Sequence, residues 1–192
     1  MSFDFVWQHA HPVGKHSFQC GYCGHMVDSD LGYFAPGRDG VIAKILICPT
    51  CSNPTYFDGL EKQHPSVRLG NQVNGISENG VLNLYNEARD CTSVGAYTAA
   101  FLLCRKILIS IAVQHGADKG EGFVSCIGYL EEKGYVPPDG KKWVDAISKK
   151  GNEATHEIVL KTEKEGKQIL HVVEMLLRFI YEFPSMLEED ED

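Results

Sequence analysis

The pattern of hydrophobic and polar positions changes character about one third of the way along the chain. The first sixty or so residues contain short apolar runs bounded by turn residues, and the clearest run covers residues 41–47. The segment from Pro36 to Gly40 predicts the turn of a β-hairpin before this run, because Pro and Gly supply the backbone conformations that turns require. We therefore expect a small β-rich part over residues 1–63.

A polar segment over residues 64–80 follows this β-rich part. It is broken by Pro65 and by three glycines, which interrupt any regular period of apolar residues. We interpret it as a connection and place the domain boundary there.

Helical periodicity begins after Gly80. The pattern predicts helices over residues 81–89, 96–115, 121–133 and 163–183, and a further helix from residue 137 to about residue 150. The second of these is apolar almost all round, which is typical of a central helix that packs on several faces. The helical part is expected to cover residues 81–184.

The last predicted helix is amphipathic. Its polar face is expected to hold Glu174, Arg178 and Glu182, opposite a stripe of Ile, Val, Leu and Phe residues. Pro184 is expected to end it. The acidic residues 185–192 that follow are expected to be disordered.

The charge of the chain limits its classes of partner. It has 192 residues with 18 Lys and Arg against 26 Asp and Glu, a formal charge of −8, and five of the acids form the run Glu188–Asp192. This balance excludes a protein that binds nucleic-acid phosphates over its whole surface, because non-specific nucleic-acid affinity comes from clustered Lys and Arg. Any contact with RNA or DNA must be local.

Seven cysteines divide into a group of four near the N-terminus and three in the helical part. The odd number, the paired spacing of the first four and the lack of a signal-peptide pattern favour a reducing compartment over a disulfide scaffold. We expect a cytoplasmic protein. Cys91, Cys104 and Cys126 are expected to be core residues.

Cys20 and Cys23 form one C-x2-C unit, and Cys48 and Cys51 form a second one after 24 intervening residues. Such a turn lets two thiolates point at one ion, and four thiolates satisfy the tetrahedral preference of zinc with no open position for water. The spacing therefore predicts one structural Zn²⁺ per chain in a zinc ribbon. The expected fold class is α+β, with this small ribbon followed by an all-α bundle.

Two alternatives remain for this metal site. An iron–sulfur cluster also accepts four thiolates, although nothing in the sequence requires redox chemistry. Four histidines lie in the same region, and one of them would have to replace a cysteine to act as a ligand. These histidines are His9, His11, His16 and His25.

The apolar segment from Ala96 to Val113 approaches the length of a membrane span. Arg105 and Lys106 lie side by side within it, and each would cost about 2.5–3.5 kcal/mol at the centre of a bilayer. We therefore expect a buried helix and no membrane.

Four segments of the helical part form a recognisable set: Tyr85–Arg89, Ala96–Arg105, Gly134–Pro138 and Gly151–His156. With these segments the chain resembles a widespread uncharacterised bacterial domain family, found alone behind zinc ribbons and fused to type I restriction subunits. The resemblance covers roughly residues 80–183 and implies kinship to the HEPN superfamily of helical bundles, a homodimer and a bacterial or phage defence system.

Active HEPN ribonucleases carry an Arg-Asn-x-x-x-His motif that cleaves RNA without metal. Asn152 and His156 match its Asn and His, but Gly151 stands where the motif has Arg. The resemblance implies that His156 would act as general acid or base, with Asn152 beside it, while the missing cation would have to come from Arg105 or Lys150. His156 and Asn152 can equally join two helices by hydrogen bonds, and Arg105 can pair with a buried acid.

One basic cluster is present in the chain, and it gives the candidate nucleic-acid contact. Such a cluster is more often a solvated helix face than a surface that binds phosphates. Its members are Lys141, Lys142, Lys149 and Lys150.

Three functions are consistent with these patterns. The first is a non-catalytic binding module for nucleic acid or a protein partner, which the Gly151 departure and the acidic charge favour. The second is a metal-independent endoribonuclease that uses His156. The third is an acidic inhibitor or mimic, suggested only by the charge and the tail.

Overall fold

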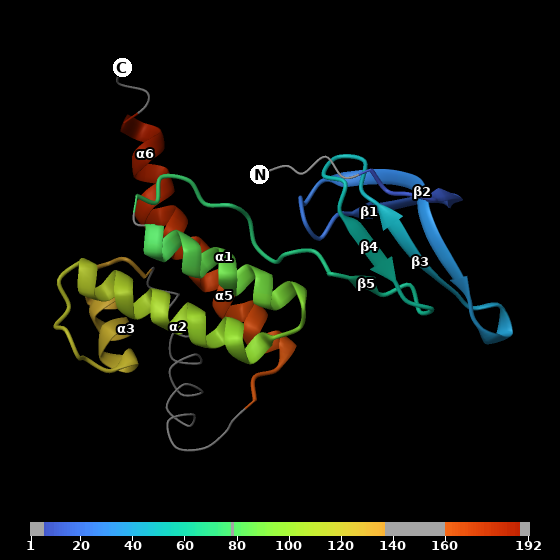
Figure 1. The fold of residues 1–192 in the computed structure, drawn as a ribbon. Helices are drawn as coiled ribbons and strands as arrows, with labels where there is room; N and C mark the ends of the chain where they lie inside the picture. The colour runs from blue at the N-terminus through green and yellow to red at the C-terminus, as the bar shows by residue number, and fades with distance from the viewer. Residues whose placement is uncertain (1–5, 78, 137–159, 189–192) are drawn as a thin grey trace. The chain divides into compact units, whose positions relative to one another are not determined.

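The computed structural model describes residues 6–77, 79–136 and 160–188. The chain divides into two compact units, Met1–Arg68 and Leu69–Asp192. The first contains an antiparallel sheet and the second contains helices, so the expected α+β class is confirmed (Figure 1). The helix expected over residues 137–150 lies outside the described residues.

The N-terminal unit is a five-stranded antiparallel sheet in which each strand pairs with the next one along the chain. Pro36 pairs with Ile42 across a tight connection that contains a 3₁₀ turn, η1 (Arg38–Gly40), so the predicted hairpin is confirmed. The strands are β1 (His11–Gln19), β2 (Met26–Pro36), β3 (Ile42–Ile47), β4 (Pro54–Phe57) and β5 (Gln63–His64).

The hydrophobic core of this sheet is small. Phe18 of β1 and Phe57 of β4 meet edge to face with ring centroids 5.2 Å apart, and Val27, Leu46 and two cysteines complete the cluster. A core of this size gives limited stability, so a unit like this one commonly depends on a metal or on disulfides.

The C-terminal unit is built around one central helix. The helices are α1 (Asn79–Ser93), α2 (Tyr97–Gln114), α3 (Phe123–Glu132), α5 (Glu163–Leu177) and α6 (Phe183–Glu188), with a π-helical segment, η3 (Arg178–Glu182), between the last two. Helix α2 packs against α1, α3 and α5. Cys104 and Cys126 lie in this core with at most 1% of their surface exposed, as predicted.

Helix α2 is long and apolar enough to cross a membrane by length and composition alone. It is the one such helix among the described residues. Seven of its residues are buried, and six of these belong to the helical core.

The C-terminal helix departs from its predicted form. Pro184 does not end it, because the chain passes through the π-helical turn η3 and Pro184 then occupies the first turn of α6, where a missing N–H group is tolerated. Residues 185–188, expected to be disordered, belong to this helix. Residues 189–192 lie outside the described residues.

Residues 69–77, which we call the strap, are packed onto the helices rather than forming a free connection. Val73 is 2% exposed and belongs to the helical core. Arg89 of α1 donates hydrogen bonds from Nε to the carbonyl of Leu69 and from Nη2 to the carbonyl of Gly70, at 3.1 and 3.0 Å. Tyr85 of α1 donates to the carbonyl of Asn71 at 2.8 Å.

Two carboxylates hold the other side of the strap, and both were expected on a polar surface. Glu174 accepts hydrogen bonds from the backbone N–H and the side-chain amide of Asn71, at 3.1 and 3.0 Å. Glu182 accepts the equivalent pair from Asn74, at 3.2 and 3.3 Å. Arg178 lies between them and contacts both carboxylates. The prediction that Glu174 and Glu182 face solvent is therefore wrong, since they are 8% and 6% exposed.

Replacing Glu174 by Ala should lower the free energy of unfolding of the helical unit by about 2–4 kcal/mol. The change removes the buried carboxylate that accepts two hydrogen bonds from Asn71 and takes away one of the two acids that pair with Arg178. Urea denaturation followed by far-UV circular dichroism measures the loss.

Glu163→Ala is the matched control for this change. Its carboxylate pairs with Lys167 on the exposed face of α5, where an ion pair contributes less than about 1 kcal/mol. Equal stabilities for the two variants would contradict the assigned role of the buried carboxylate.

Candidate metal centre

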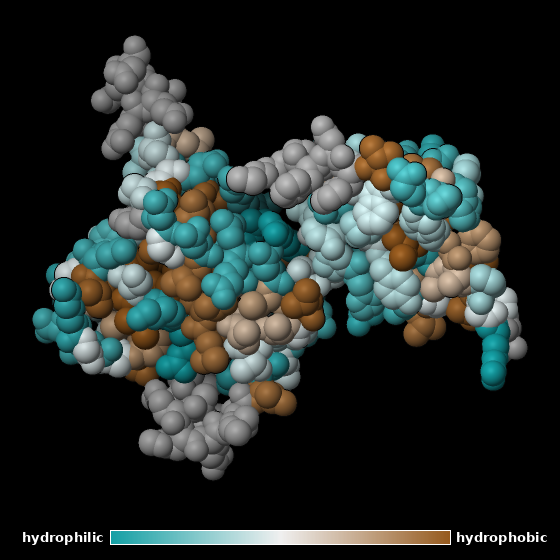
Figure 2. Space-filling view, viewed as in Figure 1, coloured by the Kyte–Doolittle hydropathy of each residue, from teal (hydrophilic) through white to brown (hydrophobic). Residues whose placement is uncertain are grey.

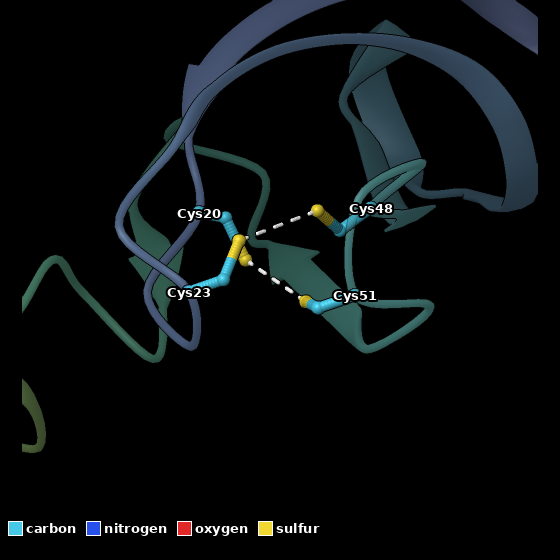
Figure 3. Close-up of side chains that lie close together, drawn as sticks. All are labelled: Cys20, Cys23, Cys48 and Cys51. Atoms are coloured by element: carbon cyan, nitrogen blue, oxygen red, sulfur yellow. Dashed lines mark hydrogen bonds between the residues drawn. The ribbon is translucent and has the colours of Figure 1, made fainter. Parts of the chain in front are cut away.

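The four N-terminal cysteines come from two turns of the sheet unit. Cys20 and Cys23 lie in the turn between β1 and β2, and Cys48 and Cys51 lie in the turn between β3 and β4. Figure 3 shows all four side chains pointing toward one another. The antiparallel order of the strands brings both turns to the same end of the sheet, so residues that are distant in sequence form one cluster.

The two turns have the same backbone hydrogen bonds. The N–H of Cys20 donates to the carbonyl of His25, and the N–H of Cys48 donates to the carbonyl of Asn53, at 2.9 and 3.0 Å. In each turn the fourth residue after the first cysteine donates back to that cysteine's carbonyl at 2.9 Å. These residues, Gly24 and Ser52, both have positive φ angles of 75° and 58°.

The distances between sulfur atoms fit a single tetrahedral ion. The Sγ atoms of Cys20 and Cys51 are 3.8 Å apart, and so are those of Cys23 and Cys48. Four thiolates at about 2.3 Å from one zinc ion would lie about 3.8 Å from one another. All four Sγ atoms lie within 4.8 Å of each other, so the cluster is compatible with one zinc site. A multi-iron cluster would hold its thiolates on different metal atoms and therefore further apart.

Two of the four cysteines resist ionisation, and a third ionises more readily than a free thiol. Burial raises the pKa of Cys20 and raises that of Cys23 to about 12. Burial also opposes ionisation of Cys51, but hydrogen bonds from Asn53 and from neighbouring cysteines lower its pKa to about 7. Four thiolates this close repel one another, so a dication is what would allow all of them to ionise together.

Backbone amides are oriented to support negative charge on the sulfur atoms. The N–H of Tyr22 donates to Sγ of Cys20 at 3.4 Å, and the backbone of His25 and Asn53 donates to Cys23 and Cys51. Among the described residues, the group that could hold a metal contains cysteines alone. None of the four nearby histidines belongs to it, so the His-for-Cys alternative has no support from the geometry.

The other predicted site residues are separate from this cluster. Arg105 lies on α2 in the helical unit, with its guanidinium 4.5 Å from the ring centroid of Phe123, and partial burial lowers its pKa. The remaining candidates lie outside the described residues, so their contacts with Arg105 stay predictions. They are Lys141, Lys142, Lys149, Lys150, Asn152 and His156.

Sequence reasoning missed the residues that shape the second turn. Trp7 donates from its indole nitrogen to the carbonyl of Ser52 at 2.8 Å, and Asn53 donates to the carbonyl of Cys51 at 3.3 Å. A signal was available in part, because Ser52 occupies the position after Cys51 that Gly24 occupies after Cys23. Nothing in the local pattern indicates Trp7, which lies 45 residues away.

Substitutions at the two positive-φ positions, Gly24 and Ser52, should affect zinc affinity differently. Gly24→Ser places a side chain at φ 75°, which costs about 1 kcal/mol and should lower the affinity about fivefold. Ser52→Gly removes the same strain and should leave the affinity equal or higher. Competition with a chromophoric chelator measures both, and an unchanged affinity for Gly24→Ser would contradict the shared turn geometry.

The comparisons with known proteins concern the helical unit. No curated protein and no solved structure matches the chain. A family model described as a domain of unknown function, DUF4145, matches residues 86–190. This match begins within α1, includes the rest of the described helices and covers more than half of the chain. The chain therefore belongs to the DUF4145 family.

Proposed function

We propose that this protein is a non-catalytic binding module in which a structural zinc ion stabilises a small sheet that docks a protein partner. The observation that carries the proposal is the closed set of four cysteines in a sheet whose β2–β3 hairpin, at the other end, exposes apolar residues. The proposal also places the chain in the cytoplasm, where thiols stay reduced.

Zinc is the ion that this donor set favours. Four thiolates at tetrahedral spacing are typical of structural zinc, and they leave no position for a substrate or an activated water. When bound, the ion would supply the cross-link that the small core lacks, and the residues that hold it would be Cys20, Cys23, Cys48 and Cys51.

The surface offered to a partner lies around the tip of the β2–β3 hairpin, and we call it the hairpin surface. It consists of Phe34, Val41, Ile42 and Leu60, which are 51%, 44%, 43% and 91% exposed. In Figure 2, hydrophobic residues reach the molecular surface near this hairpin. Exposed apolar residues gathered in this way mark interaction sites more often than isolated ones do.

The members of the hairpin surface are held close together by the sheet. The strand register places Phe34 and Ile42 on the same face, because Phe34 pairs with Lys44 and Ile42 pairs with Pro36. The Val41 side chain packs on Gly59, where an added Cβ would lie 2.2 Å from Cγ1 of Val41. Leu60 directly follows Gly59 in the sequence.

The charge of the ribbon favours a protein over a nucleic acid. Residues 1–64 hold four Lys or Arg against six acids, and four thiolates with one Zn²⁺ add a further charge of −2. Affinity for RNA or DNA comes mainly from cations placed against phosphates. A protein partner is bound through apolar anchors instead.

The ribonuclease alternative rests on the resemblance to HEPN proteins alone. Its residues His156 and Asn152 lie outside the described residues, and Gly151 departs from the motif. The expectations of a homodimer and of a role in bacterial or phage defence also rest on the family resemblance alone.

Zinc binding should be lost when one ligand is removed. Elemental analysis of the purified protein should find one zinc ion per chain, and Cys48→Ser should lose it together with the fold of the sheet unit. Acidification should also release the ion, because protons compete with zinc for the thiolates.

Cys91→Ser provides the matched control for this loss. Cys91 is partly buried on α1, in the other unit, so its replacement should leave the zinc content unchanged. A metal-free wild type, or zinc retained by Cys48→Ser, would contradict the proposed site.

Partner binding should depend on the hairpin surface. Affinity capture from extract of the source cells should retain a protein on the wild type, and the double variant Phe34→Ser, Ile42→Ser should retain at least tenfold less of it. Met26→Ser is the control, since Met26 is 70% exposed and lies at the other end of β2.

Nuclease treatment and an RNA cleavage assay separate the alternatives. The captured protein should remain after nuclease treatment, and a labelled RNA pool should stay intact. Capture of nucleic acid alone, or cleavage that His156→Ala abolishes, would contradict the proposal in favour of the ribonuclease.

A further inference from the structure

One face of the sheet holds a line of apolar and aromatic side chains that the core does not use. The strand register pairs Tyr33 with Ile45, Ile45 with Tyr56, and Tyr56 with His64. Residues that pair directly across antiparallel strands point to the same face, so these four side chains cross β2, β3, β4 and β5 in one line (Figure 1). We call these four residues the aromatic row.

The row lies on the side of the sheet opposite to its core. Leu46 and Phe57, which follow Ile45 and Tyr56 in their strands, are 0% and 4% exposed and belong to the hydrophobic cluster. Successive residues of a strand point to opposite faces, so the row is turned away from that cluster. Tyr56 is accordingly 43% exposed, and the side chain of His64 is 47% exposed. Burial in the core of the sheet therefore does not explain the row.

Neighbouring groups hold the rings of the row in place. The ring centroids of Tyr56 and His64 are 5.9 Å apart, with the ring planes inclined at 35°. At the other end of the row, the hydroxyl of Tyr33 donates to the carbonyl of Gln8, and Trp7 meets the Tyr33 ring edge to face with centroids 6.5 Å apart. A surface that is already ordered in this way loses little side-chain freedom when it binds a ligand.

The spacing of the two tyrosines matches the repeat of a polyproline II helix. Tyr33 and Tyr56 lie two strands apart. Neighbouring strands are about 4.8 Å apart, so the backbones at these two residues are separated by about 9.6 Å. A polyproline II helix has three residues per turn and rises about 3.1 Å per residue, which gives about 9.3 Å per turn. Proline rings one turn apart would therefore reach both tyrosines.

We propose that the aromatic row binds a proline-rich segment of a partner protein in the polyproline II conformation, with a Lys or Arg beside the prolines. Such segments dock on surfaces lined by aromatic rings, and they lose little conformational entropy because their extended form is largely preformed. The row is separate from the hairpin surface, since Phe34 follows Tyr33 in β2 and its side chain points to the opposite face.

The charge of the sheet unit favours the basic residue in this occupant. Residues 1–64 hold four Lys or Arg against six acids, and the acid nearest to the row is Asp58, 3.6 Å from His64. A cation beside the prolines is attracted by this excess of acids. The phosphates of a single-stranded nucleic acid or of an anionic membrane would be repelled by the same charges.

A second copy of the chain fits the row poorly. An aromatic side chain has roughly 150–250 Å² of surface to bury. Tyr56 is 43% exposed, and Tyr33 and Ile45 are exposed to a smaller extent, so the whole row offers roughly 300 Å². A stable dimer buries about 800 Å² on each partner. The area of the row therefore corresponds to a short segment of chain.

Two labelled peptides test the proposal by fluorescence anisotropy with the full-length protein. The first contains four Ala-Pro-Pro repeats followed by Arg, and the second contains four Gly-Ser-Ala repeats followed by Arg, so that length and charge are equal. The wild type should bind the proline peptide at least tenfold more tightly than the flexible one. Replacing the Arg of the proline peptide by Glu should weaken binding severalfold.

Substitutions at the centre of the row test its aromatic part. Tyr56→Ala should lose at least tenfold in affinity for the proline peptide, because it removes the ring next to His64. Tyr56→Phe keeps the ring and should stay within about threefold of the wild type. Met26→Ser is the control, since Met26 is 70% exposed and begins β2 outside the row. Its affinity should equal that of the wild type.

Nuclear magnetic resonance on the wild type locates the peptide without any substitution. Addition of the proline peptide should shift the amide signals of Tyr33, Ile45, Tyr56 and His64 and leave those of the helical unit in place. Shifts confined to the helical unit, or to Val41 and Leu60 of the hairpin surface, would contradict the assignment of the row.

Three results of the binding assay would overturn the proposal. The first is equal affinity of the wild type and of Tyr56→Ala for the proline peptide. The second is no binding of that peptide by the wild type. The third is tighter binding of a single-stranded oligothymidylate that Tyr56→Ala abolishes, since the row would then stack bases instead of prolines.

Discussion

The helical unit depends on two buried carboxylates that share one arginine. Glu174 and Glu182 each accept hydrogen bonds from the backbone and the side-chain amide of an asparagine of the strap, and Arg178 pairs with both carboxylates. Buried charges are tolerated when they are paired and hydrogen-bonded, and each of these carboxylates has an ion pair with Arg178 and two hydrogen bonds from the strap. The strap, the π-helical turn and the direction of α6 all follow from satisfying these groups.

The sheet unit has only a small hydrophobic core, and it is closed by different interactions. Its hydrophobic cluster contains few large side chains, and two of its buried members are the cysteines Cys20 and Cys48. The sulfur atoms therefore belong both to the core and to the candidate metal centre. The helical unit is closed by hydrogen bonds between the strap and two buried carboxylates. The sheet unit brings its two cysteine turns together at the candidate metal centre.

Features that depend on neighbouring residues could be predicted from the sequence. The C-x2-C spacing encodes two tight turns, the segment Pro36–Gly40 encodes the hairpin, and the all-round apolarity of residues 97–114 encodes a central helix. The buried roles of Glu174 and Glu182 could not be predicted, because their partners lie 103 and 108 positions away. Local periodicity places such residues on the polar face, as it does for any exposed glutamate.

The end of the last helix could not be predicted from the sequence either, although the residues involved are close together in the chain. A proline normally predicts a helix end, and Pro184 was assigned that role from its identity alone. The π-helical turn before Pro184 widens the spacing of the helical hydrogen bonds from four residues to five. No residue in that segment indicates this change. The positive φ of Ser52 is indicated only by its position, which matches that of Gly24 after the first cysteine pair, because the residue type that commonly indicates this conformation is Gly.

The separation of the two cysteine turns in the sequence determines when the cluster can form during synthesis. The first turn emerges from the ribosome with only two of the four sulfur atoms, and the others follow 25 residues or more later. Because domains fold as they are synthesised, β1 and β2 can pair while the cluster is still half complete. The cluster can therefore close only on a chain that extends through Cys51, and a shorter chain lacks at least one of the four sulfur atoms.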